Sequence, residues 1–346
     1  MRELKLMLAT LGVATMMAGG VPGAACAPGG TCPAPAPERA DTFLPSGRMA
    51  LGANYWASHA ATEMWRKWDA KAVEEDLRVL AANGFRLLRV FPNWADFQPI
   101  HACYLSANNF DKVNETRLFD AEEPLPDTPC GRAGVDERMV ARFEAFCDLA
   151  EKYGIRLIVP LLTGQMTFRN YIPPALANRN PFSDPYALMW EGRYLECMVS
   201  RLKAKKAIVA WESGNEARIL GKSANAFHSE AWLRYVHQTI RLADPSRPVI
   251  GVDGLEISRE TLWPSAMNAA LSDYTTTHPY GFWGAVYNDD FLSVRSTTFA
   301  AAQTYALAQI GGKPAFIEEH GSRRQEQASQ ANVAKHMRNM LWNSWA

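Results

Sequence analysis

Short apolar runs alternate with longer amphipathic stretches along most of this chain. The apolar runs have the length of buried strands, and the amphipathic stretches repeat apolar residues every three to four positions, as helices that cover a core do. This alternation is typical of an α/β fold in which crossover helices join parallel strands. Seven runs are predicted as strands: residues 49–56, 85–91, 155–161, 207–216, 248–254, 274–280 and 315–319.

Seven helices are predicted between and after these strands. Val73, Leu77 and Leu80 share one face of the first helix, which ends at Asn83 and Gly84, a pair typical of a left-handed C-terminal cap. Seven strand and helix pairs in series predict a (β/α)8 TIM barrel that stops before its eighth strand, because an open seven-stranded edge would leave backbone groups unpaired. The predicted helices are residues 70–82, 135–153, 185–203, 227–243, 259–271, 291–310 and 325–345.

A long insertion, residues 92–134, interrupts the alternation and is rich in Pro, Asn and Asp. Loops of this length in a compact domain are usually functional or stapled, so we expect it to form one wall of the site. A bridge between its Cys103 and Cys130 would add ~3 kcal/mol of stability, and two free thiols are the alternative. Cys147 and Cys197 fall on apolar faces of predicted helices, where we expect core residues.

The N-terminal segment has the layout of an exported protein. Residues 1–25 combine a basic start, a short apolar stretch and small residues, as a secretory signal peptide does, and a buried helix is the alternative. Residues 26–40 are rich in Pro, Gly and Ala and predict a tether, which leaves 41–346 as the barrel domain. We therefore expect a secreted or periplasmic protein. A lipid anchor on Cys26 is the less favoured form, because Gly23 stands where a large aliphatic residue is usual.

Composition excludes several classes of partner. The 346 residues are 48% hydrophobic, enough for one large core. Lys plus Arg (36) equal Asp plus Glu (36), so the chain has no electrostatic footprint for nucleic acid or an anionic membrane. The seven histidines form no His-x-His or His-Glu-x-x-His pattern, and no Cys-x-x-Cys occurs, so we expect no metal and no other cofactor. Oligomeric state is not readable from the sequence.

Two predicted strands deliver glutamates to their ends. The stretch AIVAWESGNE ends on Asn215 and Glu216, and KPAFIEEHG contains Glu319. In a TIM barrel these strand ends share one mouth, so the two acids would face each other. Cleaving a glycosidic bond with retention needs such a pair, because one carboxylic acid protonates the leaving oxygen while a carboxylate about 5 to 5.5 Å away attacks the anomeric carbon. We expect burial beside a second negative charge to raise the acid's pKa, and Arg89 to keep the nucleophile ionised.

WESGNE resembles the strand-four Asn-Glu signature of the clan A glycoside hydrolases, and KPAFIEEHG resembles the strand-seven nucleophile motif of their family 5 members. The resemblance covers almost all of the chain from residue 49 onward. It implies a (β/α)8 barrel, net retention and no metal cofactor. It implies that Glu216 is the acid/base and that Asn215 holds the sugar's 2-hydroxyl. Glu319 matches the nucleophile because it directly precedes His320 and a glycine, and Glu318 is expected to point the other way along the strand.

Further positions match the same family in register. Arg89 in LLRVF matches the strand-two arginine, and His278 and Tyr280 in HPY match the strand-six pair, whose tyrosine contacts the nucleophile. Asn54 in GANYW is similar to the first strand. The chain departs from the pattern in lacking the eighth-strand tryptophan, in having no histidine at the end of the third strand, and in carrying His320 where an aromatic residue is usual.

Eleven tryptophans add candidate sugar-stacking surfaces. Trp56, Trp94 and Trp283 follow predicted strand ends, where a flat ring would meet a sugar, and a place in the core is the alternative for each.

Together these features predict a retaining β-glycoside hydrolase that cleaves β-mannan, β-glucan or related β-linked oligosaccharides through two glutamates. The alternative is a non-hydrolytic carbohydrate-binding protein on a decayed barrel. Arg89 as a structural ion-pair partner and His278 as a core histidine are the corresponding alternatives for single residues. The sugar, its linkage and endo or exo action stay open, because single hydroxyl contacts from loops decide them.

Overall fold

The computed structural model describes residues 50–107, 116–252, 262–280, 294–321 and 328–345, and the predicted signal peptide and tether lie outside these ranges. Parallel strands occupy each of the seven predicted positions. Five of them form one sheet in chain order, and the last two pair beside it through a parallel bridge between Ile250 and Tyr274. The strands are β1 (Gly52–Tyr55), β2 (Leu87–Val90), β6 (Arg156–Pro160), β9 (Ile208–Glu212) and β10 (Val249–Ile250), then β11 (Thr275–Thr277) and β12 (Ala315–Ile317).

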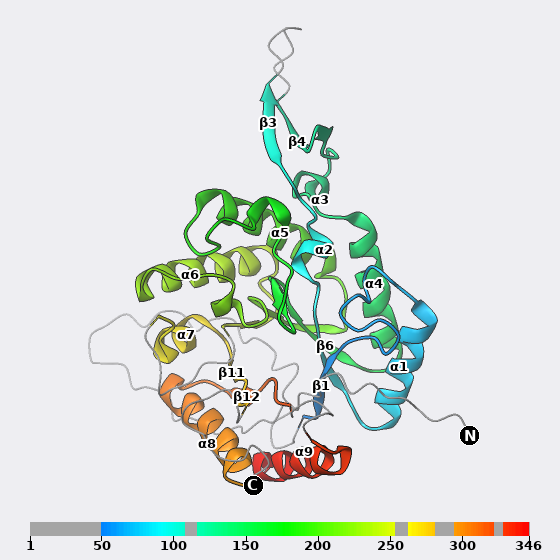
Figure 1. The fold of residues 1–346 in the computed structure, drawn as a ribbon, viewed down its shortest axis with the longest axis vertical. Coiled ribbons are helices and arrows are strands. Elements are labelled where there is room, and N and C mark those ends of the chain that lie inside the picture. The colour runs from blue at the N-terminus through cyan, green and yellow to red at the C-terminus, as the bar shows by residue number, and fades with distance from the viewer. Residues whose placement is uncertain (1–49, 108–115, 253–261, 281–293, 322–327, 346) are drawn as a thin grey trace.

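Helices surround these strands on the outside (Figure 1). The predicted bounds of α1 are confirmed, and the Asp69 side chain caps its start by accepting from two backbone N–H groups. Gly84 and Gly154, which follow α1 and α4, have φ of 85° and 64°, the left-handed conformation expected of a helix stop. The main helices are α1 (Ala70–Ala82), α4 (Glu137–Lys152), α5 (Pro185–Leu202), α6 (Ala226–Ala243), α7 (Ser265–Leu271), α8 (Val294–Gly311) and α9 (Gln330–Trp345).

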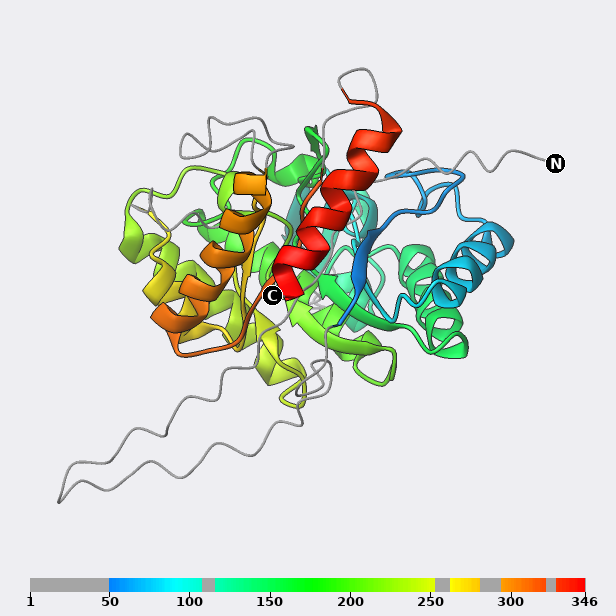
Figure 2. The same cartoon turned by 90° about the horizontal axis from the view of Figure 1, so that it is seen from below.

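Helix α9 lies between α8 and β1 in both views of the ribbon (Figure 2). The Asn343 side chain donates to the hydroxyl of Thr297 on α8 at 2.6 Å, which ties the two helices together. Within the described residues no strand pairing joins β12 to β1. A parallel α/β fold is therefore confirmed, and the (β/α)8-type barrel expected from the sequence stays a prediction.

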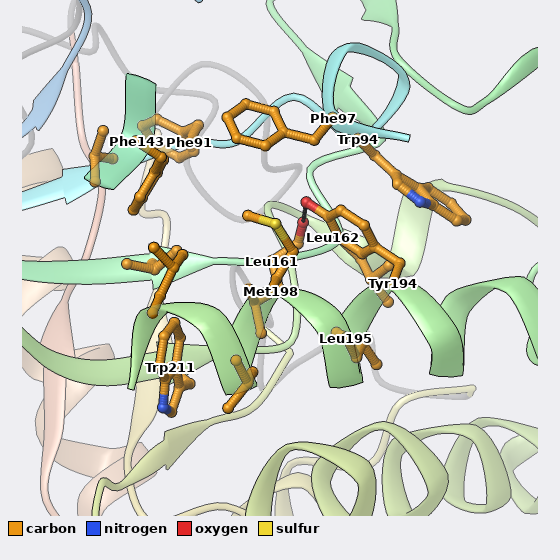
Figure 3. Packing of buried hydrophobic residues seen from close by; sticks show 14 of the residues in the cluster. Phe91, Trp94, Phe97, Phe143, Leu161, Leu162, Tyr194, Leu195, Met198 and Trp211 are labelled. Carbon is orange, nitrogen blue, oxygen red and sulfur yellow. Dashed lines mark hydrogen bonds between the residues drawn. The ribbon is translucent and has the colours of Figure 1, made fainter. Parts of the chain in front are cut away.

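The core has an inner and an outer layer. The inner cluster takes residues from β2, β6, β9, β10 and β12 and from the position just before β11: Leu87, Ile158, Val209, Ala210, Ile250, Tyr274 and Phe316. The outer layer fills the space between strands and helices with aromatic and aliphatic side chains (Figure 3). There the buried Tyr194 hydroxyl donates to the Leu161 carbonyl at 3.2 Å, so a polar group in the apolar layer is satisfied.

The insertion after β2 builds an arm that extends away from the ring of helices (Figure 1). The Tyr186 hydroxyl of α5 donates to the Cys103 carbonyl at 2.9 Å and ties the first strand of the arm to the body. Its predicted role as a wall of the site stays a prediction. The insertion contains α2 (Trp94–Phe97), the antiparallel strands β3 (Cys103–Ala107), β4 (Thr116–Asp120) and β5 (Glu123–Pro124), and α3 (Pro129–Arg132).

The predicted bridge between Cys103 and Cys130 is wrong. Cys130 is bonded to Cys197, and Cys103 and Cys147 are free thiols. The reason is that α3 packs against α5, which brings the α-carbons of Cys130 and Cys197 to 5.1 Å. Cys197 is thus a bridging residue instead of the simple core residue we expected, whereas Cys147 is buried as predicted.

Short elements complete the described chain. The hairpin of β7 (Gln165–Met166) and β8 (Arg169–Asn170) follows β6, and two 3-10 turns lie at η1 (Pro174–Leu176) and η2 (Ala217–Ile219). Among the described helices, none has the length and apolar character needed to cross a bilayer.

Candidate active site

The predicted polar residues meet at the carboxyl ends of the parallel strands. Asn54 and Arg89 come from β1 and β2, and Glu216 follows β9. His278 directly follows β11, and Glu319 lies two residues beyond β12. We call the connected group formed by Asn54, Arg89, Glu212, Asn215, Glu216, His278, Tyr280, Glu318 and Glu319 the strand-end cluster.

Arg89 is the centre of the strand-end cluster. Its side chain is 3% exposed, and its Nε and Nη2 donate to the two oxygens of Glu212 at 2.8 and 2.5 Å. Its Nη1 donates to Asn215 Oδ1 at 3.0 Å and to Glu319 Oε2 at 3.3 Å. A two-pronged contact of this kind fixes the guanidinium plane, so Arg89 can orient groups from β9 and β12 at once.

Glu319 accepts hydrogen bonds from three side chains, which come from β1, from β2 and from the segment after β11. Asn54 Nδ2 donates to Oε2 at 3.1 Å, beside Arg89, and the Tyr280 hydroxyl donates to Oε1 at 2.5 Å. Burial, together with the negative charge of Glu319, raises the pKa of Tyr280 well above its ordinary value, so the phenol stays a donor. Both carboxylate oxygens of Glu319 are therefore held in a defined orientation while its side chain stays 14% exposed.

Glu216 lies on a strained stretch of backbone. Its φ is 44° and its ψ is 42°, a left-handed conformation that costs a residue other than glycine ~1–2 kcal/mol. Its side chain is 24% exposed, and His278 Nδ1 lies 3.2 Å from its Oε1. Such strain is found at functional sites more often than elsewhere.

The expected rise in the pKa of Glu216 is not found. Burial is the largest influence and raises this pKa, but the hydrogen bond and charge of His278, with Arg218 and Arg89 behind them, outweigh it and lower the pKa. The sequence shows that other acids are near, but it does not show that the imidazole of His278 contacts Glu216. A proton shared between Glu216 and His278 is the chemical consequence, since the two groups are in hydrogen-bonding contact.

Both candidate catalytic acids, Glu216 and Glu319, lie close to the same nitrogen atom of His278. Its Nδ1 lies 3.2 Å from Glu216 Oε1 and 3.8 Å from Glu319 Oε2. Those two oxygens are therefore at most about 7 Å apart, the sum of the two distances, which is compatible with the close carboxyl pair of a retaining glycosidase. The sequence expectation that both acids face one site agrees with this geometry.

Two further buried carboxylates belong to the cluster and were not recognised as site residues in the sequence. Glu212 is fully buried on Arg89, and the signal for it was its place at the end of a strand in WESGNE. Glu318 was expected to point away from the site, and this is wrong. Its Oε2 lies 3.2 Å from His278 Nε2 and its Oε1 lies 3.5 Å from Arg89 Nε. Alternation of side chains fails here because β12 ends at Ile317, before both acids.

The tryptophans expected to bind sugar lie mostly in the core. Trp94 is fully buried and its Nε1 donates to Gln98 Oε1 at 2.7 Å, so its proposed role as a subsite is wrong; it begins α2 and turns inward beside Tyr194 (Figure 3). Trp56 is 7% exposed and stacks on Phe91, with ring centroids 5.0 Å apart, so little of its ring is left for a sugar. Trp283 lies outside the described residues.

No group of three or more His, Cys, Asp or Glu side chains suited to hold a metal ion occurs in the described part of the chain. The carboxylates of the strand-end cluster are in contact with Arg89, His278, Tyr280 and Asn54. Its groups can donate, accept and move protons, which is the chemistry of acid, base and nucleophile.

Comparison of sequences finds mannan-degrading enzymes. No family model matches the chain. It is 26% identical over 235 residues to probable mannan endo-1,4-beta-mannosidase F of Neosartorya fischeri, covering 61% of this chain and 49% of that protein. It is 27% identical over 191 residues to mannan endo-1,4-beta-mannosidase A of Aspergillus aculeatus, covering 50% of this chain and 48% of that protein. The chain thus spans about half the length of the curated relatives it matches.

Comparison of structures finds related folds. The exo-beta-1,4-mannosidase from Opitutaceae bacterium strain TAV5 has a TM-score of 0.69 at 21% identity, over 85% of this chain and 49% of that one. A GH5_18 protein from Bifidobacterium longum subsp. longum has a TM-score of 0.67 at 18% identity, over 85% and 66% of the two chains. In sequence and in fold, the chain is therefore similar to the family 5 glycoside hydrolases of clan A.

Proposed function

We propose that this protein is a retaining β-glycoside hydrolase with Glu216 as acid/base and Glu319 as nucleophile. The observation that carries the proposal is the convergence of both carboxylates on His278 Nδ1 at the strand ends. A pair of carboxylates held this close, one oriented by three donors and one in contact with an imidazole, has the components of a double displacement.

The proposed reaction has two steps. In the first, a Glu319 oxygen attacks the anomeric carbon, the bond to the leaving oxygen breaks, and Glu216 gives that oxygen its proton. In the second, Glu216 takes a proton from water, the water oxygen bonds to the anomeric carbon, and Glu319 leaves. Asn54, Arg89 and Tyr280 keep the attacking carboxylate in place through both steps, which reduces the entropy lost in reaching the transition state.

Mannose-containing substrates are the class we propose first. The curated relatives are named mannan endo-1,4-beta-mannosidases, and the structural relatives include a mannosidase and a GH5_18 protein solved with Manb1-4GlcNAc. The strand-end cluster is compatible with any β-linked pyranoside, because its described contacts orient carboxylates and do not yet select a sugar. We propose a β-mannosidic linkage, with β-glucan as the sequence-based alternative. The (β/α)8-type barrel expected from the sequence belongs to the same proposal.

Turnover of β-1,4-mannan, manno-oligosaccharides, aryl β-mannosides and aryl β-glucosides by the full chain tests this proposal. We expect hydrolysis of a mannoside with a β-anomer as first product in an NMR time course. Glu319→Ala and Glu216→Ala should each lower kcat at least about 10³-fold, with azide rescuing the second variant on an activated aryl mannoside. Labelling with a 2-fluoro mannosyl fluoride should modify Glu319, as read by mass spectrometry of the peptide.

Glu191→Gln is the matched control for these variants, since it alters a buried glutamate between α5 and α6, outside the strand-end cluster. It should keep the activity of the wild type. An α-anomer as first product, or a label on another residue, would contradict the assigned mechanism. Binding of manno-oligosaccharides without turnover by well-folded wild-type protein would favour the non-hydrolytic alternative.

A further inference from the structure

Glu318 is a buried acid that the two-step reaction leaves without a role. Its side chain is 1% exposed, and it occupies the far side of His278 from Glu216. Its Oε2 lies 3.2 Å from His278 Nε2, while Glu216 Oε1 lies 3.2 Å from His278 Nδ1. One imidazole, itself 2% exposed, therefore stands between two carboxyl groups at equal distance.

An imidazole in this position constrains where protons lie. A neutral ring has one donor nitrogen and one acceptor nitrogen, and an imidazolium has two donors. With Glu318 present as a carboxylate on Arg89, two states satisfy both contacts. In one, His278 is an imidazolium that donates to both carboxylates. In the other, Nε2–H donates to Glu318 and Nδ1 accepts from a protonated Glu216. The two states differ only in the place of one proton between Nδ1 of His278 and Oε1 of Glu216.

We propose that Glu318 is a positioning residue that acts through His278 to keep this proton available to Glu216 for the acid step. The inference rests on the proposed function and extends it, since it assigns the source of the proton. Because Glu318 accepts a hydrogen bond from Nε2–H, Nε2 of His278 stays protonated. Nδ1 then presents to Glu216 either the shared proton or, after that proton has moved, its lone pair.

The proton transfer is balanced. The Nδ1–H bond of His278 breaks as the Oε1–H bond of Glu216 forms, and the ring becomes the neutral Nε2–H tautomer. Glu216 then passes the proton to the leaving oxygen as the glycosidic bond breaks. In the second step Glu216 takes a proton from water, and this proton returns to the shared position between Glu216 and His278, so the cycle ends where it began.

The surroundings of Glu318 keep it charged. Arg89 from β2 lies 3.5 Å from its Oε1 through Nε. Burial raises the pKa of Glu318, but the charges of Arg89 and His278 outweigh it and lower that pKa. Further charged or titratable groups near this point, within the part of the chain that the structure describes, include Glu212 and Glu319 on Arg89, Tyr280 on Glu319, and Arg218, whose charge acts on Glu216.

Substitution of Glu318 is therefore expected to shift the pH dependence of kcat/KM in a defined direction. Removing one negative charge lowers the proton affinity of the coupled pair of His278 and Glu216, whichever of the two holds the proton. In Glu318→Gln the alkaline limb of the kcat/KM profile should move to lower pH by about one unit. In Glu318→Asp, which keeps the charge on a shorter side chain, the limb should stay within a few tenths of the wild-type position.

The matched control is again Glu191→Gln, the same chemical change at a buried glutamate away from His278, and it should leave the limb unmoved. A Glu318→Gln enzyme with a lower kcat and an unmoved alkaline limb would show a purely structural role and overturn the proposal. An equal shift in Glu318→Gln and Glu318→Asp would overturn it as well, because then the charge is not the cause.

A second measurement needs neither activity nor a variant at Glu318. In wild-type protein labelled with ¹⁵N-histidine, the ring signals of His278, identified as those missing from His278→Asn, should show a proton on Nε2 across the accessible pH range. A neutral ring protonated on Nδ1 alone would overturn the inference. If the wild type hydrolyses no glycoside, the proposed function fails while this experiment still decides where the His278 proton lies.

Discussion

The pKa values of two buried glutamates in this molecule are shifted in opposite directions. Glu318 lies in the strand-end cluster, where Arg89 and His278 outweigh burial and lower its pKa. Glu191 lies in the layer between α5 and α6, where its described polar contact is the indole N–H of Trp232 at 3.0 Å, and burial raises its pKa to about 8. Both side chains are almost fully buried. The difference teaches that burial alone neutralises an acid, and that a nearby cation decides whether a buried acid stays charged.

The same contrast separates two ways of holding the protein together. The strand-end cluster depends on paired charges, so removing one member leaves others buried without compensation. The region around α5 depends on apolar packing, on the Cys130–Cys197 bridge from α3 to α5, and on an acid facing α6 that burial keeps neutral. Four predictions test this comparison, from the largest expected effect to the smallest.

Arg89→Ala should have the largest effect. It leaves Glu212 and Glu318 buried without their guanidinium partner, so we expect a loss of about 3 to 5 kcal/mol in the free energy of unfolding and a fall in kcat of ~10³-fold or more. Urea denaturation followed by circular dichroism measures the first. Arg201→Ala is the control, because Arg201 is 39% exposed on a surface pair and should cost less than about 1 kcal/mol. Similar losses in both variants would remove the distinction between the two environments.

Removing the disulfide should destabilise the other region without affecting chemistry. The bridge joins cysteines 67 positions apart, and replacing both Cys130 and Cys197 with Ala should lower the free energy of unfolding by about 4 kcal/mol. The kcat of the folded protein should not change, since α3 and α5 contribute no member of the strand-end cluster. Cys103→Ala, at a free thiol, serves as the control. A large loss of kcat in the double variant at low temperature would contradict this separation.

Glu191 should make stability fall as pH rises. Its folded pKa of about 8 lies above the ordinary value of 4.5, so the folded state binds the extra proton between these values, and this contribution is present at low pH and lost on the way up. Between pH 5 and 7.5, Glu191→Gln should gain about 3 kcal/mol relative to the wild type. Parallel urea curves at both pH values measure it, and a constant difference between the two proteins would refute the raised pKa.

Tyr280→Phe should have the smallest effect and should act mainly on catalysis. It removes one donor to Glu319 and keeps the aromatic ring, so a hydrogen bond to a charged group is lost and kcat should fall about 10- to 100-fold. The melting temperature should change by only a few degrees. Tyr194→Phe, which removes a hydroxyl that bonds the Leu161 carbonyl in the outer core, is the matched control and should leave kcat unchanged.

The sequence predicted the parallel strands and their ends well, because both signals are local. An apolar run of strand length followed by small and polar residues gives β9 and β12 directly, and the helix stops at Gly84 and Gly154 depend on nothing outside their own turns. The resemblance to family 5 then identified polar residues that the structure brings together, from Asn54 to Glu319. Their chemical roles are proposals that the experiments above address.

Other features depend on contacts that a single sequence does not display. The partner of Cys130 is set by the packing of α3 on α5, across 67 positions. Glu318 was misplaced because alternation holds only while a strand continues, and β12 stops one residue earlier. The direction of the Glu216 pKa depends on the imidazole of His278, which approaches from another strand. Trp94 was misjudged for a related reason, since a strand end can lead into a buried helix.

The left-handed backbone at Glu216 has a practical consequence for anyone who engineers this protein. Glycine adopts that conformation without steric penalty, so Glu216→Gly is expected to exceed Glu216→Ala in free energy of unfolding by ~1 kcal/mol, although both variants lose the acid. A library sorted by heat resistance alone would therefore rank inactive chains at this position by backbone strain. Selection for thermal tolerance in this scaffold should be coupled, in every round, to a readout of sugar release.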